Sequence, residues 1–262
     1  GEEPRLIYVG VTRPMPPSPG RRLVVDIGGR STEMIVGLRR TPLVAESFQI
    51  GSVSLSMRYF GDGRFTEVGF RNAQVAAGAE LEEALEVFAP GQWGEALGSS
   101  GTAGAVSQVL LASGVTDGRI TPEGLRWCMD QCLRAGRTDR LSLPSLKEDR
   151  KAVLGGGLSI LYTLSTHFGI DTLLPARGAL RQGVIFDLAE RLNAVRDAEH
   201  AHDMRDASVQ HLQERFDVDV GQARRVQEVA KALHASVATE ASLESQRELD
   251  WAAALHELGL MV

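Results

Sequence analysis

Apolar residues near the start of the chain come in short runs that are separated by turn residues. This pattern predicts strands at Leu6–Val9, Leu23–Ile27, Glu33–Val36 and Val44–Ile50. A proline-rich loop over residues 13–20 separates the first two runs, and a glycine-rich turn joins the second to the third. The first part of the chain is therefore expected to form a β-sheet.

From residue 66 onward, the apolar positions repeat with the spacing of helices. Thr66 can cap a helix that reaches about Phe88, and Thr102 can cap a helix over Ala103–Leu111. Thr121 is followed by a proline and a glutamate, a combination typical of a helix start. The remaining predicted elements of this region are a helix at Leu158–Phe168, a strand at Thr172–Leu174 and a helix from Gly178 to about Leu192.

A polar stretch over residues 193–206 marks a predicted domain boundary. Three helices and no strand are predicted beyond it, at Ser208–Phe216, Gly221–Val237 and Leu249–Leu258. Strands alternating with helices, followed by helices alone, indicate an α/β domain and then a helical one. We therefore expect an α/β domain over residues 1–192, a linker over 193–206 and the start of a helical domain over 207–262.

The composition is that of a soluble globular protein, with 43% hydrophobic and 24% charged residues. No apolar run approaches the roughly 20 residues that span a bilayer, and the N-terminus lacks the pattern of a secretory signal. Cys128 and Cys132 have no further cysteine or histidine at metal-ligand spacing. We interpret them as reduced thiols and expect a cytoplasmic protein without a membrane span.

The net charge of −6 argues against a general affinity for polyanions, and no nucleic-acid partner is expected. A polyanionic substrate would need a local basic channel. The candidates are the clusters Arg21-Arg22, Arg39-Arg40, Lys147 to Lys151 and Arg177 to Arg181. Each of these could equally be a solvated surface.

The segment from Asp26 to Glu33, with sequence DIGGRSTE, carries the clearest chemical signal. An acid ends a buried strand, and Gly28 and Gly29 let backbone N–H groups approach an anion closely. Such a turn can hold phosphate oxygens while Asp26 binds Mg²⁺ directly or through water. A plain hairpin whose glycines serve only the turn is the alternative.

Two further segments fit the same chemistry. Gly98 to Thr102, with sequence GSSGT, joins a strand to a helix and would present free N–H groups to a phosphate. Glu2 and Glu3 precede an apolar run, and a carboxylate there could orient and deprotonate an attacking water. Helix capping and an acidic loop are the respective alternatives.

Taken in order, these segments resemble the exopolyphosphatase and guanosine pentaphosphate phosphohydrolase family. The resemblance rests on the motif EEPRLI at Glu2 to Ile7, on Asp26 to Glu33 and on Gly98 to Thr102. It continues with GALRQG at Gly178 to Gly183 and WAAALHELG at Trp251 to Gly259. It implies the second lobe of an actin-like ATPase (ribonuclease H-like) α/β fold, followed by an all-helical domain related to HD phosphohydrolases.

The resemblance also implies roles for individual residues. Glu3 would be the catalytic base for water, and Glu33 would lie near the active site. Asp26 would assist metal and phosphate binding, with Mg²⁺ as cofactor. The remaining implied site residues bind phosphate: Gly28, Gly29, Arg30 and Ser31 of the first turn, and Gly101 and Thr102 of the second.

The chain departs from the family pattern at three places. Arg30 replaces the third glycine of the first turn; a positive φ there would strain it, and its side chain could either cap the phosphates or block them. Arg177 replaces a residue that is often acidic. The family's first lobe, with its own phosphate turn, has no counterpart in this sequence, so the chain is expected to be truncated and to hold half of the site. His256 stands in an HD-like segment in which Glu257 replaces the aspartate, and we interpret it as structural.

The resemblance implies an exopolyphosphatase, which releases terminal phosphate from inorganic polyphosphate, although the fragment alone could be inactive. Hydrolysis of guanosine pentaphosphate is the nearest alternative, and a non-catalytic phosphate- or nucleotide-sensing module is an alternative of another class. A kinase of the same broad fold is less consistent with the sequence, which shows no adenosine-pocket signal beyond the Gly98 turn. The parent protein is expected to be a homodimer.

Overall fold

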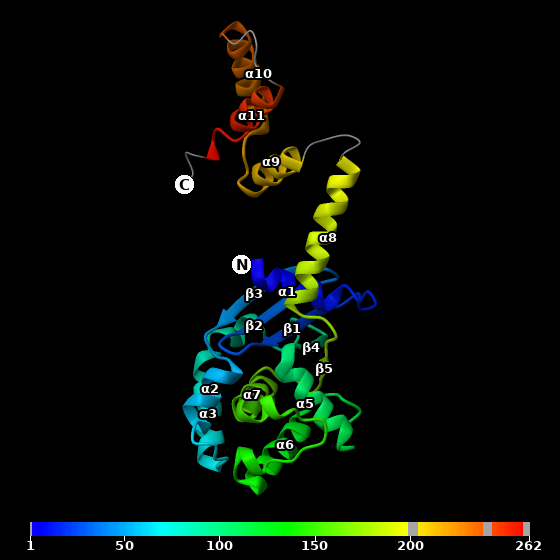
Figure 1. Ribbon diagram of the computed structural model, residues 1–262, viewed down its shortest axis with the longest axis vertical. Helices are drawn as coiled ribbons and strands as arrows, with labels where there is room; N and C mark the ends of the chain where they lie inside the picture. The colour runs from blue at the N-terminus through cyan, green and yellow to red at the C-terminus, as the bar shows by residue number, and fades with distance from the viewer. Residues whose placement is uncertain (1, 199–203, 238–242, 259–262) are drawn as a thin grey trace. The chain divides into compact units, whose positions relative to one another are not determined.

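A computed structural model describes residues 2–198, 204–237 and 243–258. The chain divides into two compact units, Gly1–Asp187 and Leu188–Val262. The first unit is an α/β domain and the second is built of helices (Figure 1). The α/β domain and the helical C-terminal part that the sequence predicted are therefore present, and each unit is described below by itself.

A five-stranded mixed sheet forms the centre of the first unit, in the order β3-β2-β1-β4-β5. Strand β1 (Arg21–Ile27) pairs antiparallel with β2 (Thr32–Leu38), which pairs antiparallel with β3 (Thr41–Phe48). On its other side β1 pairs parallel with β4 (Glu95–Ser99), and β4 pairs parallel with β5 (Leu173–Pro175). β1 is central because its residues are buried on both faces of the sheet, whereas β3 lies at an exposed edge.

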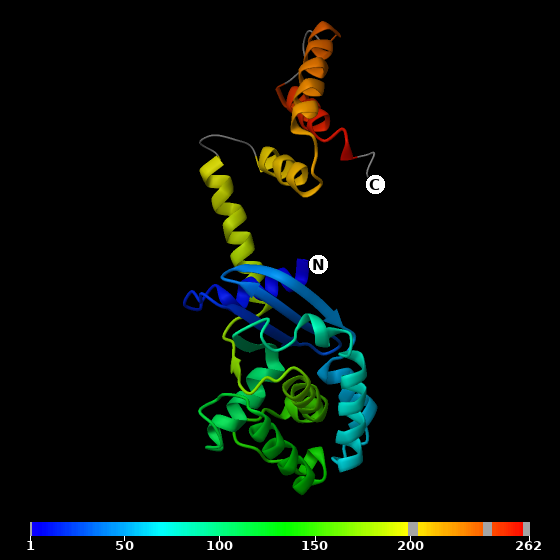
Figure 2. The same cartoon turned by 180° about the vertical axis from the view of Figure 1, so that it is seen from behind.

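Helices cover the two faces of the sheet unequally (Figures 1 and 2). Helix α1 (Glu2–Thr12) packs on one face, where Ile7, Tyr8 and Val11 meet the strands. The larger hydrophobic core lies on the other face, and the helices there are α2 (Ser52–Phe60), α3 (Glu67–Glu80), α4 (Ala84–Val87), α5 (Ser100–Ala112), α6 (Pro122–Ala135) and α7 (Glu148–His167).

Leu6–Val9, predicted as a strand, is instead part of helix α1. The prediction was wrong because a short apolar run fits a strand and a buried helix equally well. The buried positions Ile7, Tyr8 and Val11 have helical spacing and form one face against the sheet. The strands predicted at Leu23–Ile27 and Glu33–Val36 are confirmed within β1 and β2. The strand predicted at Val44–Ile50 corresponds to β3, which begins earlier, at Thr41, and ends at Phe48.

Two helix starts are confirmed by their caps. Thr66 Oγ1 accepts a hydrogen bond from the Gly69 amide, and Thr121 Oγ1 accepts one from the Gly124 amide. The helix predicted from Thr66 to Phe88 is interrupted, since α3 ends at Glu80 and α4 follows separately.

Three other boundaries differ from the prediction. Helix α5 begins at Ser100 rather than after Thr102, and α7 begins at Glu148 rather than at Leu158. Helix α8 (Leu180–Ala198) continues past Leu192 into the predicted linker. Glycines 155–157 lie inside α7, close to α2, α5 and Phe60, so tertiary packing overrides their low helix propensity.

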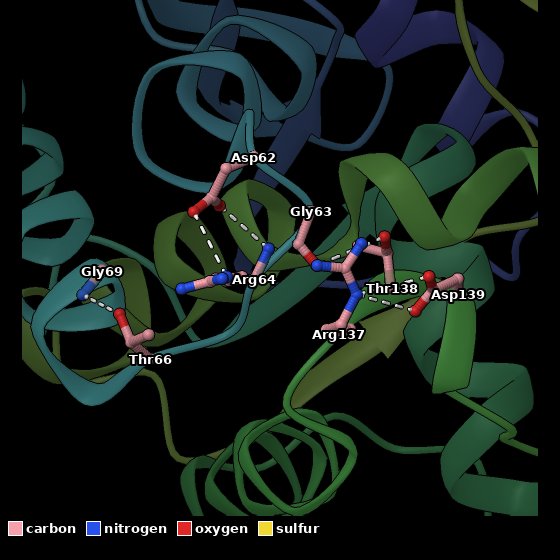
Figure 3. A network of polar contacts seen from close by, with 8 residues as sticks. All are labelled: Asp62, Gly63, Arg64, Thr66, Gly69, Arg137, Thr138 and Asp139. Carbon is pink, nitrogen blue, oxygen red and sulfur yellow. Dashed lines mark hydrogen bonds and ion pairs between the residues drawn. The ribbon is translucent and has the colours of Figure 1, made fainter.

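The loop between α2 and α3 and the loop after α6 are joined by hydrogen bonds between their backbones, in the region that Figure 3 shows. The Thr138 amide donates to the Gly63 carbonyl at 2.9 Å, and the Phe65 amide donates to the Gly136 carbonyl at 2.9 Å. Two ion pairs, Asp62–Arg64 and Arg137–Asp139, flank this junction on the exposed side. The contact ties the connection between α2 and α3 to the one after α6.

Helices α1 and α8 cross at backbone-to-backbone distance. A Cβ atom added to Gly183 would lie 1.8 Å from the Leu6 carbonyl oxygen, and one added to Gly10 would lie 2.2 Å from the Ala179 carbonyl oxygen. Gly178 is equally close to the backbone of Gly10. Only glycine permits this crossing, which explains in physical terms the glycines of the GALRQG segment.

The second unit contains α9 (Met204–Arg215), α10 (Val220–Val237) and α11 (Leu243–Ala254). These helices confirm the three predicted beyond the boundary, with the last beginning earlier than Leu249. Ala223 and Ala254 are buried, and Gln213 Nε2 donates to the Ala254 carbonyl at 2.9 Å. His256 Nδ1 lies 3.0 Å from the Ala253 carbonyl. No helix in the described ranges is long and apolar enough to cross a membrane.

Because α1 and α8 are in backbone contact, we expect one methyl group added at the crossing to reduce stability strongly. Gly183→Ala should lower the free energy of unfolding by about 1–3 kcal/mol, because the helices must separate to admit the Cβ atom. Gly104→Ala is the control, since nothing lies within 4 Å of its Cβ position; it should raise stability by roughly 0.5–1 kcal/mol. Urea unfolding of the two variants measures both, and equal effects would contradict the crossing.

Candidate active site

A row of four polar side chains crosses the sheet from strand to strand. Ser99 of β4 is the register partner of Asp26 of β1, Asp26 is the partner of Glu33 of β2, and Glu33 is the partner of Ser47 of β3. Register partners point to the same face. The alternation along the strands places this row on the α1 face, together with the buried Val24, Ile35 and Leu97.

The two acids of the row are buried, and each accepts a hydrogen bond from an outer serine. Asp26 is 6% exposed and Glu33 is 4% exposed. Ser99 Oγ donates to Asp26 Oδ2 at 2.7 Å, and Ser47 Oγ donates to Glu33 Oε1 at 2.9 Å. The hydroxyl groups fix the orientation of the carboxylates and stabilise their charged forms.

The pKa of Asp26 is raised above its usual value, chiefly because burial penalises the charged carboxylate. Hydrogen bonds from Ser99 and Ser100 oppose this shift, and the negative charges of Glu33 and Glu3 add to it. Glu3 is exposed on the first turn of α1, the helix that packs on the same face of the sheet as the row. Of the acids that the resemblance implied for the site, Asp26 and Glu33 are therefore neighbours in the sheet, and Glu3 is carried by the helix that covers their face.

The start of α2 forms hydrogen bonds with the turn after β1. The amides of Ser52, Val53 and Ser54 donate to the carbonyls of Gly28 and Gly29 at 2.9–3.1 Å. A Cβ atom on Gly51 would lie 2.3 Å from the Arg30 nitrogen, so the two backbones are in direct contact. The carbonyls of the turn thus face α2, which fixes its conformation.

The amide groups of the first turn differ in what they can offer to an anion. The Gly28 amide already donates to the Ser31 carbonyl at 2.9 Å. Within the part of the chain that the structure describes, the amides of Gly29, Arg30 and Ser31 donate to no other residue. Consecutive free amides in a fixed turn make an anion-binding site, so Gly29, Arg30 and Ser31 can contact a phosphate directly, whereas Gly28 supports the turn.

Arg30 is accommodated without backbone strain. The described non-glycine residues with positive φ are Arg39, Ser100, Ser145 and Asp217, and Arg30 is not among them. The strain considered from the sequence is therefore absent. Its side chain is exposed and forms no ion pair or hydrogen bond with any other described residue, so it remains available to a ligand.

The second phosphate-type turn, Gly98 to Thr102, packs against the end of β1, just before the first phosphate-type turn. Ser100, with φ of 69°, donates through Oγ to the Ile27 carbonyl at 2.7 Å, and Thr102 Oγ1 donates to the same carbonyl at 3.3 Å. The Thr102 hydroxyl thus supports the end of β1, and a contact with phosphate would come from its backbone amide. Gly101 and Thr102 belong to the first turn of α5, where free amides and the helix dipole favour an anion.

A basic cavity of about 510 Å³ lies beside the start of α5. Lys147, Arg150 and Arg177 contribute its positive charge, and Gly101 belongs to its wall. The Arg150 guanidinium covers Gly101, since a Cβ atom there would lie 2.6 Å from its nitrogen atoms. Two basic clusters that are far apart in the sequence therefore meet at one site, while Lys151 pairs with Glu148 at 2.7 Å instead.

Sequence reasoning missed three residues of this site. Ser47 and Ser99 bind the acids, but no signal in the sequence gives the strand register that pairs them. Arg150 lay within a charged cluster, and only its position over the phosphate-type turn distinguishes it from a solvated surface residue.

The acids fit a magnesium ion that is shared with a substrate. Among the described residues, no three His, Cys, Asp or Glu side chains are grouped closely enough to hold a metal by themselves. Mg²⁺ is usually bound by one or two carboxylates together with water and substrate phosphates. Asp26 and Glu33 beside two anion-binding turns match this ligand set.

The profile of the Ppx/GppA phosphatase family matches residues 1–192, and that of the family's domain III matches residues 204–262. This chain belongs to the Ppx/GppA phosphatase family. The resemblance seen in the motifs is therefore confirmed. Residues 193–203, which lie between the two matches, belong to the stretch that was predicted as a linker.

Curated Ppx/GppA relatives align along the whole chain. The guanosine-5'-triphosphate,3'-diphosphate pyrophosphatase of Aeromonas hydrophila is 34% identical over 264 aligned residues, which cover all of this chain and 51% of the relative. The protein of the same name from Pseudoalteromonas atlantica is 33% identical with the same coverage. The chain spans about half the length of these relatives.

Solved structures of the family share the fold. An exopolyphosphatase from Cytophaga hutchinsonii aligns with a TM-score of 0.62 and 19% identity, covering 72% of this chain and 63% of the other. The PPX-GPPA enzyme of Aquifex aeolicus aligns with a TM-score of 0.59 and 22% identity, covering 70% and 62%. At these identities the likeness concerns the architecture.

The raised pKa of Asp26 predicts a stabilising substitution. Without divalent ions and near pH 7, Asp26→Asn should raise the unfolding temperature, because it removes a buried charge next to Glu33 and Glu3. A carboxyl with a raised folded-state pKa destabilises the fold only while it is ionised. The gain should therefore disappear as acidification protonates Asp26 in the wild type.

Asp139→Asn serves as the control for this measurement. Asp139 is an exposed carboxylate whose pKa is lowered by its hydrogen bond to Arg137, so its substitution should not raise the unfolding temperature. Thermal scans between about pH 4 and pH 8 in EDTA provide the comparison. A less stable Asp26→Asn variant near pH 7 would show that the ionised carboxylate is stabilised rather than penalised.

Proposed function

We propose that this chain forms the phosphate-handling half of a hydrolase that removes the terminal phosphate of guanosine pentaphosphate. The observation that supports this most strongly is the buried Asp26–Glu33 pair set between two anion-binding turns. The members of the row come from four strands, so they are held on a rigid floor. A binding module would need the turns, but buried like charges destabilise a fold and suit a site that also holds a cation.

The reaction assigns a task to each part of the site. Glu3, exposed on the first turn of α1, accepts a proton from water, and the water oxygen attacks the terminal phosphorus. The bond to the bridging oxygen breaks, and that oxygen leaves with the remaining phosphates. Asp26 and Glu33 would hold Mg²⁺, which neutralises the phosphate charge when bound. The amides of Gly29, Arg30 and Gly101 donate to the phosphate oxygens.

A nucleotide fits the site better than the inorganic polyphosphate that the sequence first favoured. The cavity beside α5 has the volume of a small-molecule pocket, and its apolar wall includes Leu111 and Pro175. The named relatives, 34% and 33% identical, act on a guanosine nucleotide. Polyphosphate is the second candidate, because Lys147, Arg150 and Arg177 could also accompany a linear polyanion.

Two observations weaken the alternative of a non-catalytic sensing module. Arg30 lies in the first turn without a positive φ, and Glu3 forms no side-chain bond with another described residue that would block it. The cytoplasmic location and the homodimeric parent protein stay predictions from the sequence.

Removing the proposed base gives the first functional prediction. Glu3→Ala should lower kcat for Mg²⁺-dependent phosphate release from guanosine pentaphosphate by about 100-fold or more, because water is no longer activated. Phosphate is measured for this chain alone and for the chain joined to the first lobe of a family relative. Glu82→Ala, at an exposed glutamate of the α3–α4 connection, is the control. Equal rates in wild type and Glu3→Ala would contradict the assignment.

Removing a cavity arginine separates the two substrates. Arg150→Ala should weaken guanosine pentaphosphate binding about 10- to 100-fold, the loss expected for a charge-assisted hydrogen bond at a partly enclosed site. Arg126→Ala, at an exposed arginine paired with Glu123, is the matched control. Calorimetric titrations with the nucleotide and with long-chain polyphosphate are compared. A loss confined to polyphosphate would reverse the order of the two candidates.

A further inference from the structure

Arg5 connects the first turn of α1 to α8. Its Nη2 atom lies 2.6 Å from Glu2 Oε1 and 2.5 Å from Asp187 Oδ1, and its Nε atom donates to Glu2 Oε2 at 3.1 Å. Asp187 is 18% exposed and Arg5 is 36% exposed at the side chain. The pKa of Arg5 is raised, first by its hydrogen bond to Glu2 and further by Asp187. Arg5 thus contacts a residue that lies 182 positions away in the sequence, Asp187.

This ion pair distinguishes the two acids at the start of α1. The Glu2 carboxylate is engaged by Arg5 in two hydrogen bonds. Glu3 is exposed and forms no side-chain bond with any residue in the described ranges, and its charge adds to the raised pKa of Asp26. Arg5 therefore engages Glu2, while the carboxylate of Glu3, on the same turn of the helix that covers the face of the row, has no partner among the described residues.

The far end of α1 has a second anchor on α8. Arg13 lies over the Phe186 ring, 4.8 Å from its centre, and Arg13 Nη1 lies 3.5 Å from the Phe186 carbonyl. Between the anchors, Gly10 and Gly183 bring the two backbones into contact. The first amides of a helix lack partners within the helix, and the Arg5–Asp187 contact fastens this turn of α1 to α8.

We propose that Arg5 and Asp187 are positioning residues that hold the first turn of α1 against α8 and thereby set the place of Glu3 above the Asp26–Glu33 pair. The assignment rests on the proposed function, because it concerns the base of that reaction. Neither residue touches the substrate. A displacement of about 1 Å at a catalytic group can cost as much as 100-fold in rate, so this partly buried contact acts on the chemistry at a distance.

The test compares Asp187→Asn with Asp187→Glu, which retains the charge, and with Asp139→Asn, which breaks the exposed Arg137–Asp139 pair in the same unit. Asp187→Asn should lower kcat about 10- to 100-fold with KM changed less than about twofold, because binding groups on the turns are untouched. Asp187→Glu should recover most of the rate. The assays use guanosine pentaphosphate and the form of the protein in which the wild type is active.

Amide hydrogen exchange provides a second readout that does not depend on catalysis. In Asp187→Asn, the amides of Leu6 to Val9 should exchange at least about threefold faster than in wild type, and those of β1 should be unchanged. Asp139→Asn should alter neither. Faster exchange in a chain whose wild type releases no phosphate would support the clamp while the proposed function failed. Unchanged α1 exchange, or a KM increase at constant kcat, would overturn the clamp.

Discussion

Two like-charged carboxylates buried side by side on one sheet are the constraint on which the rest of the site depends. Asp26 and Glu33 are register partners across β1 and β2, and burial together with the charge of Glu33 raises the pKa of Asp26. Each accepts a hydrogen bond from a serine on the next strand, Asp26 from Ser99 of β4 and Glu33 from Ser47 of β3. Such a pair is unfavourable for the empty fold and favourable for one that receives a cation together with phosphate.

The elements around Asp26 and Glu33 hold the two phosphate-type turns in place beside this pair. The start of α2 binds the carbonyls of the first turn, so the free amides of this turn keep their place. The second turn fixes the end of β1 through Ser100 and Thr102 and offers the start of α5 to an anion. Helix α1 covers the same face, carries Glu3 on its first turn and packs closely on α8. Rigid elements thus position each group that the chemistry requires.

The sequence was sufficient where local chemistry determines structure. Strands β1 and β2, the caps at Thr66 and Thr121 and the two phosphate-type turns were all evident from residue type and spacing. It was insufficient where tertiary packing decides. Leu6–Val9 fits a strand by composition, but it belongs to helix α1, whose buried positions Ile7, Tyr8 and Val11 pack on the sheet. Ser47 contacts Glu33 because of the strand register, and Arg150 covers Gly101 because of helix packing. Neither arrangement can be predicted from a single sequence. The order of the two substrates also changed, because the motifs are common to both activities.

The most direct test of the central claim is a crystal structure of this chain with Mg²⁺ and a guanosine nucleotide whose terminal phosphate bridge cannot be hydrolysed. We expect Mg²⁺ beside Asp26 and Glu33, with phosphate oxygens on the amides of Gly29 and Arg30 and the guanosine in the cavity lined by Arg150. A nucleotide whose phosphates lie away from both turns, or Mg²⁺ bound without either acid, would contradict it.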